Sequence, residues 1–332
     1  MSLPPLLQSS LRIPAVAAPM FLASGPELVI ETCKSGVVGS FPALNQRSSA
    51  GFEQWLQQIT SALRDYEKDT GKTPAPFAVN LISHKSNDRL EADLALCEKY
   101  KVPLIITSLG AVKSLIDKVH NYGGLVFHDV TTLRHARKAA DAGVDGLIAV
   151  SAGAGGHAGT LNPFALVSEI REFFDKTLLL SGAISRGSDI VAARAMGADL
   201  AYLGTRFICT KECLAVDDYK QMIIESDAKD ILYTPNISGV YANFLIPSVR
   251  RAGLDPANLT PPDHIDFGTE FSVDADKQDD SPQVGEKTKG AWLNIWSAGQ
   301  GVANSKAVQP VAELVADLER EYRQTLSGLC ST

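Results

Sequence analysis

The chain has 332 residues, of which 45% are hydrophobic and 21% are charged, and this favours one large soluble domain or two average ones. The net charge of −7 argues against a nucleic-acid partner, because phosphate binding needs a basic face. No apolar run reaches the ~20 residues of a membrane-spanning helix, and five scattered cysteines are typical of free thiols, so we expect a cytoplasmic protein away from the membrane.

Eight short β-rich runs alternate with helical patterns from the N-terminus to residue 204. The predicted strands are 14–20, 37–41, 77–81, 104–108, 125–130, 146–151, 178–182 and 201–204. The predicted helices between them are 27–34, 52–66, 89–100, 112–120, 132–142, 163–174 and 188–196. Many strands are continuous apolar runs, as strands covered on both faces are. The alternation favours an α/β fold of the (β/α)₈ TIM-barrel type, with a doubly wound open sheet as the alternative.

The pattern changes after the eighth predicted strand. Residues 209–228 have a helical pattern, whereas 255–289 are rich in Pro, Asp, Gly and Lys and lack a sustained pattern. We therefore predict a smaller, partly irregular lid domain at 209–290, inserted into a barrel made of residues 1–208 and 291–332. A long amphipathic helix at 308–326 would return to the barrel and close it.

A glycine-rich loop, Ser151-Ala-Gly-Ala-Gly-Gly-His157-Ala-Gly, follows the sixth predicted strand. Loops after the strands carry the active site in TIM barrels. Glycines permit positive φ and a close backbone approach, and an imidazole can act as a base near neutral pH or hold an anion. A flexible loop with an incidental histidine is the alternative, but the position of the loop favours a functional His157.

Two glycine turns, Ser181-Gly182-Ala183 and Gly204-Thr205, lie one βα unit apart. Barrels often build a phosphate site from the loops after strands seven and eight, with backbone N–H groups facing the anion. Two ordinary turns are the alternative. The pair indicates a cofactor that carries a phosphate.

Three other segments have unusual polar or small residues at strand ends or turns. Ala17-Ala-Pro-Met-Phe21 could lie against a flat ring or simply end a core strand. Asn80 could bond a cofactor ring or cap a helix. Trp292-Leu-Asn-Ile-Trp296-Ser-Ala-Gly-Gln-Gly has two tryptophans that would normally anchor a core. The remaining histidines show no metal-binding spacing, so we expect no metal.

Together these motifs resemble the nitronate monooxygenase family, also called the 2-nitropropane dioxygenase family. The resemblance covers nearly the whole chain. It is carried by Ala18-Pro-Met20, Phe77-Ala-Val-Asn80, Gly155-Gly-His157-Ala-Gly, Ser181-Gly-Ala183, Gly197-Ala-Asp-Leu-Ala-Tyr-Leu-Gly-Thr-Arg-Phe207 and Ile295-Trp-Ser-Ala-Gly-Gln300.

The resemblance implies a barrel with a small lid domain, non-covalent FMN, and oxidation of alkyl nitronates by O₂ to a carbonyl compound and nitrite. It implies that His157 is catalytic and that Ser297 lies near the nitronate or nitroalkane substrate. The residues expected to bind the cofactor, four of them at its phosphate, are Ala18, Pro19, Met20, Phe21, Asn80, Asp129, Gly155, Ser181, Gly182, Ala183, Gly204 and Thr205.

The sequence also departs from the family pattern. Asp129 stands where some relatives have Lys, and Ala183 stands where relatives often have a second Gly. A cluster of Tyr and Lys known in some members is not recognisable here. An NAD(P)H-dependent flavin reductase acting on quinones or enoyl thioesters, and a flavin-free phosphosugar-type barrel, are the alternatives. A homodimer is compatible with the sequence.

Overall fold

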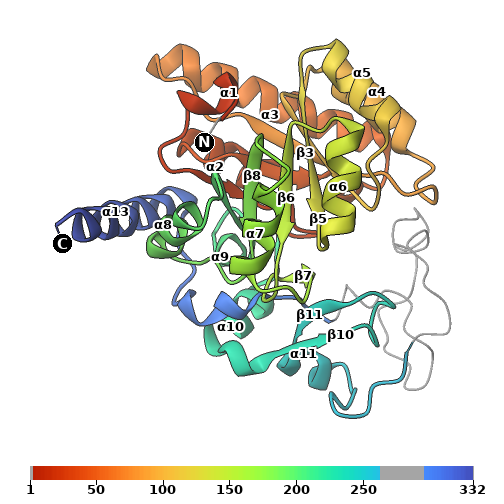
Figure 1. Cartoon of the computed structure of the whole chain (residues 1–332), viewed down its shortest axis with the longest axis vertical. Coiled ribbons are helices and arrows are strands. Elements are labelled where there is room, and N and C mark those ends of the chain that lie inside the picture. The colour runs from red at the N-terminus through yellow and green to blue at the C-terminus, as the bar shows by residue number, and fades with distance from the viewer. Residues whose placement is uncertain (1–2, 262–294, 332) are drawn as a thin grey trace.

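The computed structural model describes residues 3–261 and 295–331 (Figure 1). In these parts of the chain, eight parallel strands form the main sheet, in the order β1-β9-β8-β6-β5-β4-β3-β2. A parallel bridge between Val16 and Val38 joins the two ends of that order, which makes the sheet a barrel rather than an open sheet. The strands are β1 Ala15–Ala17, β2 Gly39–Pro42, β3 Phe77–Ile82, β4 Leu104–Ser108, β5 Leu125–Val130, β6 Gly146–Val150, β8 Thr177–Ser181 and β9 Leu200–Leu203.

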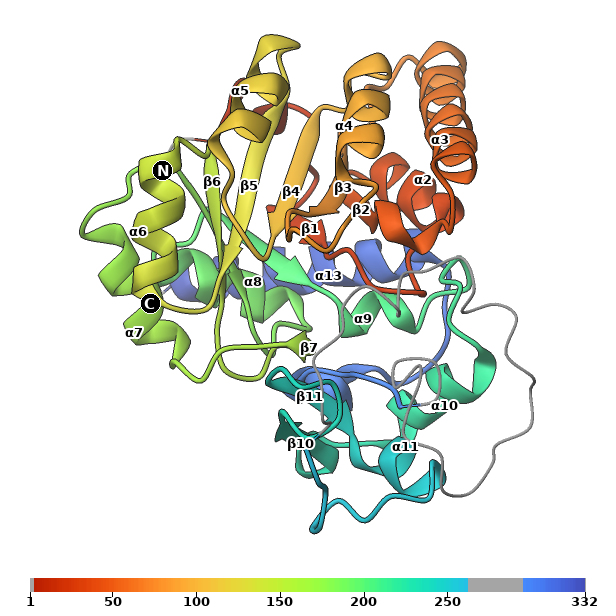
Figure 2. The ribbon, with the colours of Figure 1, turned by 90° about the vertical axis from the view of Figure 1, so that its right-hand side faces the viewer.

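Helices follow the strands and cover the outside of the barrel, as the periodicity predicts (Figure 2). Their ends obey local chemistry: the Ser48 hydroxyl accepts a bond from Gly51 N at the start of α3, and Gly71 ends that helix with φ of 69°. These helices are α2 Pro26–Lys34, α3 Ser49–Thr70, α4 Leu90–Lys99, α5 Lys113–Asn121, α6 Leu133–Ala142, α7 Pro163–Arg171 and α8 Gly187–Ala195, with the short α1 Pro5–Gln8 and α9 Thr205–Ile208.

The core has two apolar layers because successive side chains of a strand point to opposite faces. In β5, Val126 packs outward against the helices, and Phe127 packs into the barrel. The barrel interior is filled by residues that include Ala78, Ile106 and Leu179. It is therefore a packed core and not a channel.

A smaller unit lies beyond the carboxyl ends of the barrel strands (Figures 1 and 2). Its antiparallel sheet has the order β10-β11-β7, where β10 is Ile231–Thr234, β11 is Ala242–Leu245 and β7 is Gly156–His157 from the glycine-rich loop. Helices α10 Asp217–Glu225 and α11 Ile246–Arg251 accompany it.

The chain differs from the prediction in this unit. Residues 209–216 are not helical, because their backbone groups bond to distant segments: Lys211 N donates to Gln309 O, and Leu214 N donates to Ala23 O. The small sheet was not predicted at all. Residues 262–294, which include Trp292 and most of the patternless stretch, lie outside the described residues, so the lid-domain boundaries remain a prediction.

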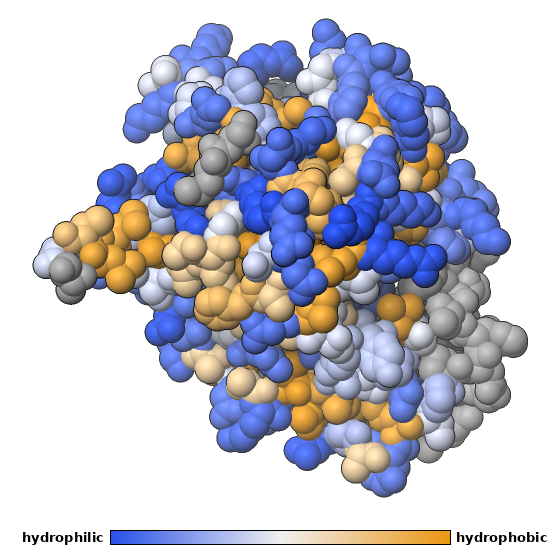
Figure 3. Space-filling view, in the orientation of Figure 1, coloured by the Kyte–Doolittle hydropathy of each residue, from blue (hydrophilic) through white to orange (hydrophobic). Residues whose placement is uncertain are grey.

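The last helix, α13 Val311–Cys330, returns to the barrel as predicted and packs against α8 and α2. The Glu321 carboxylate accepts a bond from Gly187 N at the start of α8. The C-terminal end of α13 projects from the body of the protein. Figure 3 shows apolar side chains there, and Leu326 and Leu329 are exposed. None of the described helices is long and apolar enough to span a membrane.

Candidate active site

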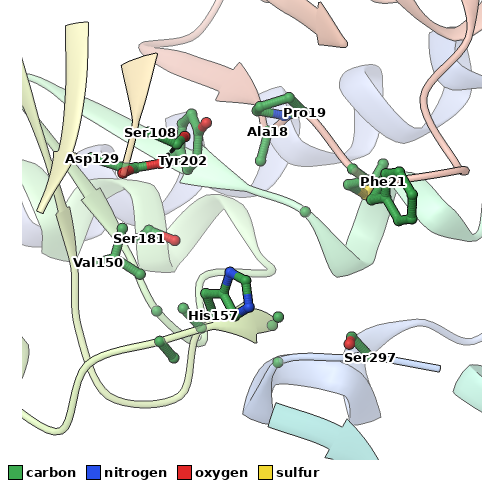
Figure 4. Close-up of a pocket in the computed structure, with 18 of the residues that line it drawn as sticks. Ala18, Pro19, Phe21, Ser108, Asp129, Val150, His157, Ser181, Tyr202 and Ser297 are labelled. Atoms are coloured by element: carbon green, nitrogen blue, oxygen red, sulfur yellow. Dashed lines mark hydrogen bonds between the residues drawn. The ribbon is translucent and has the colours of Figure 1, made fainter. Parts of the chain in front are cut away.

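A cavity of about 1370 Å³ lies between the carboxyl ends of the barrel strands and the small antiparallel sheet (Figure 4). Every site residue predicted from the sequence lines it. These residues are Ala18, Pro19, Met20, Phe21, Asn80, Asp129, Gly155, His157, Ser181, Gly182, Ala183, Gly204, Thr205 and Ser297. The structure thus brings together residues from seven separate segments, while the role of each remains a prediction.

The floor of the cavity is polar because the inward-facing rows of the strands change character at their carboxyl ends. Phe127 faces the barrel interior, and Asp129, two residues later, continues the same row into the cavity. The same step leads from Ile106 to Ser108 and from Leu200 to Tyr202. The apolar core therefore gives way to a layer of polar side chains where a ligand would lie.

Three of these polar side chains form a hydrogen-bonded chain across adjacent strands. Asn80 Nδ2 donates to Ser108 Oγ at 2.8 Å, and Ser108 Oγ donates to Asp129 Oδ2 at 2.5 Å. Figure 4 shows Tyr202 from β9 beside Ser108 and Asp129. Ser108 and Tyr202 were not predicted from the sequence, although extending the period-two alternation by one step finds both.

Burial raises the pKa of Asp129 to about 6, and the hydrogen bond from Ser108 offsets this only in part. The pKa of Tyr202 is raised by its own burial and then by the nearby Asp129 charge. Lys138 is the one lysine or arginine among the described cavity-lining residues. Asp129 thus places a carboxyl group of raised pKa, and not a cation, on the floor of the cavity.

We expect Asp129→Asn to stabilise the flavin-stripped protein at pH 8. Folding raises the pKa above its usual 3.8, so the folded state favours the protonated carboxyl. The cost of ionising it is absent below pH 4, grows as the pH rises towards 6, and is then at most about 3 kcal/mol. Urea unfolding at pH 4 and pH 8 checks this, with the exposed Asp141→Asn as control. A variant that gains nothing at pH 8 relative to pH 4 would contradict it.

His157 is held by the small sheet rather than by the barrel. It lies in β7, where it pairs with Ala242 of β11. The next residue is held twice: Tyr233 Oη donates to Ala158 O at 3.0 Å, and Ala158 N donates to Tyr241 O at 3.4 Å. The imidazole ring projects into the cavity, where it is exposed to the solvent inside (Figure 4).

The surrounding walls desolvate the imidazole and lower the pKa of His157 to about 4. At pH 7 the ring is therefore neutral and can accept a proton. The sequence left two roles open, a cation that holds an anion and a base. The lowered pKa favours the base.

The glycine turns pack tightly against one another and form a cradle in the wall of the cavity. Gly153 O accepts bonds from Ala183 N at 3.3 Å and from Gln300 N at 2.9 Å, so three loops meet at one carbonyl. Gly182 has φ of +139° and Ala183 has φ of +54°, conformations that glycine adopts most readily. Ala183 adopts this conformation although it carries a side chain.

Gly204 is different, because a Cβ there would meet protein atoms only at ordinary van der Waals distances. A Cβ on Gly204 would find its nearest neighbours, Met20 Sδ and Ala18 Cβ, at 3.8 and 3.9 Å. The protein itself does not require glycine at this position. The absence of a side chain leaves room for a ligand to approach the backbone there closely.

Ser297 presents a buried hydroxyl whose oxygen has no hydrogen-bond partner among the described residues. Its backbone is fixed, since Tyr219 Oη donates to Ser297 O and Tyr219 stacks on Trp296 at 4.9 Å between ring centroids. A buried polar atom without a partner costs free energy. Ser297 lines the cavity, and its hydroxyl is left for a partner that the described residues do not supply.

Comparison with known proteins assigns the chain to a family. The model of the family described as nitronate monooxygenase matches residues 6–321. The chain belongs to the nitronate monooxygenase family. It is therefore a flavin-dependent oxidoreductase with a TIM-barrel fold. No group of three potential metal-binding His, Cys, Asp or Glu side chains occurs in the described parts of this family member.

Individual relatives of this nitronate monooxygenase family member are distant. A nitronate monooxygenase from Paraburkholderia phytofirmans is 28% identical, over 95% of this chain and 94% of that protein. The solved structure of a nitroalkane oxidase from Streptomyces ansochromogenes has a TM-score of 0.76 at 24% identity, covering 98% and 99% of the two chains. FabK from Thermotoga maritima has a TM-score of 0.74 at 21% identity, covering 98% and 97%. At these identities the two structures show the shared fold.

Proposed function

We propose that this protein oxidises alkyl nitronates with bound FMN and O₂, giving a carbonyl compound and nitrite, and that it accepts nitroalkanes after removing a proton. One observation carries the proposal: a neutral His157 is exposed inside a cavity that also contains the glycine cradle. The family match and the relatives named as nitronate monooxygenases support it.

The residues present fit FMN. The backbone at Gly204, which no side chain covers, suits a phosphate, and the Ser297 hydroxyl, which has no partner among the described residues, suits a polar atom of the cofactor or substrate. Bound FMN would supply the electron transfer between the nitronate and O₂. Gly182, Ala183 and Thr205 would hold its phosphate, and Met20 and Asn80 would face its ring.

This chain's own side chains would then prepare the substrate. The neutral His157 imidazole would take the proton from the carbon next to the nitro group, which converts a nitroalkane into a nitronate. A preformed nitronate does not need that step. The apolar walls contributed by the small sheet would keep bulk water from the reacting carbon.

We expect FMN to copurify with the protein, because the glycine turns are proposed to hold one phosphate and the described residues show no site for the second nucleotide of FAD. Acid release followed by chromatography identifies the cofactor. FMN, with a flavin spectrum that is bleached by a nitronate under anaerobic conditions, is the expected result. Finding FAD, or a colourless protein, would contradict the proposal.

A second candidate is an NAD(P)H-dependent flavin reductase. The cavity exceeds the ~300–1,000 Å³ typical of single-ligand pockets, so it has room for a second large molecule beside FMN. A relative from Rhodococcus jostii, 26% identical over 68% of this chain and 61% of that protein, is named as a dehydrogenase of a carboxyl-CoA compound. Anaerobic mixing separates the two candidates: bleaching by NADH and not by nitronate would favour the reductase.

A further inference from the structure

The outer half of the cavity has a composition different from the half nearest the barrel. Among the residues that the structure describes, those that the small unit contributes to the lining carry no charge. Aromatic rings stand out among them: Tyr219, Tyr233, Tyr241 and Trp296. Apart from Ser297, the polar and glycine-rich groups described above come from the barrel strands and loops. An uncharged, aromatic half suits an apolar part of a ligand and not a phosphate or a carboxylate.

Two of these rings form a preassembled surface. Tyr233 and Tyr241 stack with their ring centroids 5.0 Å apart and their planes 22° apart. The position of the Tyr233 ring is fixed because its hydroxyl donates a hydrogen bond to Ala158 O at 3.0 Å. The pair is therefore ordered before any ligand arrives, and tyrosine has few rotatable bonds to immobilise on binding.

One side of the Tyr241 ring remains available. Tyr233 covers one face, yet Tyr241 as a whole is 54% exposed. Large apolar side chains that are exposed inside a cavity mark a binding surface. Val216 and Leu214, which line the same cavity, are 60% and 52% exposed.

The position of the pair relates it to the reacting group. Both tyrosines bond to Ala158, the residue directly after His157. A ligand stacked on Tyr241 would thus lie in the cavity into which the imidazole projects. The cavity volume of about 1370 Å³ leaves room for this ligand beside a cofactor.

We infer that Tyr241, backed by Tyr233, is a stacking subsite for a planar, apolar ring system carried by the substrate. This inference rests on the proposed function, and it names the substrate class: a nitronate or nitroalkane attached to an aromatic or polycyclic group. The ring lies on Tyr241, and the reacting carbon faces His157. A short aliphatic nitronate leaves this subsite empty.

Two carboxylates test the inference without turnover, because a carboxylate resembles a nitronate in shape and charge. One is 2-naphthylacetate, and the other is its saturated decahydro analogue, which has a similar apolar bulk but no flat ring. Calorimetric titration of the flavin-loaded protein gives the dissociation constant of each. We expect Tyr241→Ala to raise the dissociation constant of naphthylacetate about tenfold and that of the saturated analogue less than about threefold. The difference arises because aromatic stacking adds to the free energy gained from burying apolar area.

Two matched variants complete the experiment. Tyr241→Phe keeps the ring and should bind naphthylacetate as the wild type does. Phe164→Ala removes a ring that is 70% exposed on α7, outside the cavity, and should change neither affinity. Equal losses for both carboxylates in Tyr241→Ala, or no loss for either, would overturn the stacking subsite. Nitronate oxidation is assayed separately on the wild type, so failure of the proposed function gives a different result from failure of the subsite.

Discussion

His157→Ala is expected to lose about 10²- to 10⁴-fold in kcat/KM with a neutral nitroalkane, the range typical of general acid–base catalysis. The loss with the preformed nitronate should be much smaller, since that substrate has already lost its proton. The physical reason is the neutral imidazole: with a pKa of about 4, His157 can accept a proton at pH 7. Flavin content is measured in each preparation so that rates refer to loaded protein.

The pH profile sharpens this test. Because the pKa of His157 is lowered, the base should stay unprotonated as the pH falls past 6.5, and the nitroalkane rate should decline only towards pH 4 to 5. His84→Ala, which removes a histidine outside the cavity lining, serves as control and should leave the profile unchanged. An equal loss on both substrates would instead make His157 an anion anchor. Unchanged activity on both would remove it from the mechanism.

Much of the barrel could be predicted because its signals are local. Most strands are short apolar runs, and the helices between them have an amphipathic period. The ends are less exact: the helix predicted at 52–66 is α3 Ser49–Thr70, which is capped by Ser48 and ended by Gly71. The sequence also placed the site at the loops after the strands, and those loops do converge on one cavity. Closure was the open question, and the bridge from Val16 to Val38 answered it.

The small sheet could not be predicted because its partners are distant in the chain. β7 has only two residues within a glycine-rich loop, and it becomes a strand by pairing with β11, some 85 residues away. Without that pairing, the sequence could not show that His157 is held by Ala242 and followed by the tyrosine bonds to Ala158. Tyr233 and Tyr241 were missed for the same reason, since their stacking depends on the hairpin.

The predicted protonation behaviour of the site was also incomplete. The sequence allowed His157 to be a cation or a base, and the lowered pKa that the cavity walls give the ring favours the base. Asp129 was recognised as a departure from the family, but its bond to Ser108 and its raised pKa depend on the packing of three neighbouring strands. Such effects are properties of the assembled cavity.

Gly204→Leu is expected to abolish most FMN retention while the barrel still folds. The phosphate is proposed to approach the backbone at Gly204, where a Cβ would meet no protein atom closer than 3.8 Å. A small side chain is therefore accommodated by the protein and would be in conflict only with the ligand. For the same reason Gly204→Ala should weaken FMN binding by a smaller factor without loss of folded protein.

Gly182 illustrates why Gly204 is the better position. A Cβ on Gly182 would lie 2.8 Å from Ala152 O, and its φ of +139° disfavours any other residue, so a substitution there would disturb the turn itself. The matched control is Gly328→Leu on α13, where a Cβ meets nothing within 4 Å. Flavin-to-protein ratio after gel filtration and thermal unfolding are measured for all variants. If Gly204→Leu keeps full flavin occupancy, the phosphate does not lie over Gly204, because a leucine side chain and a phosphate cannot share that space.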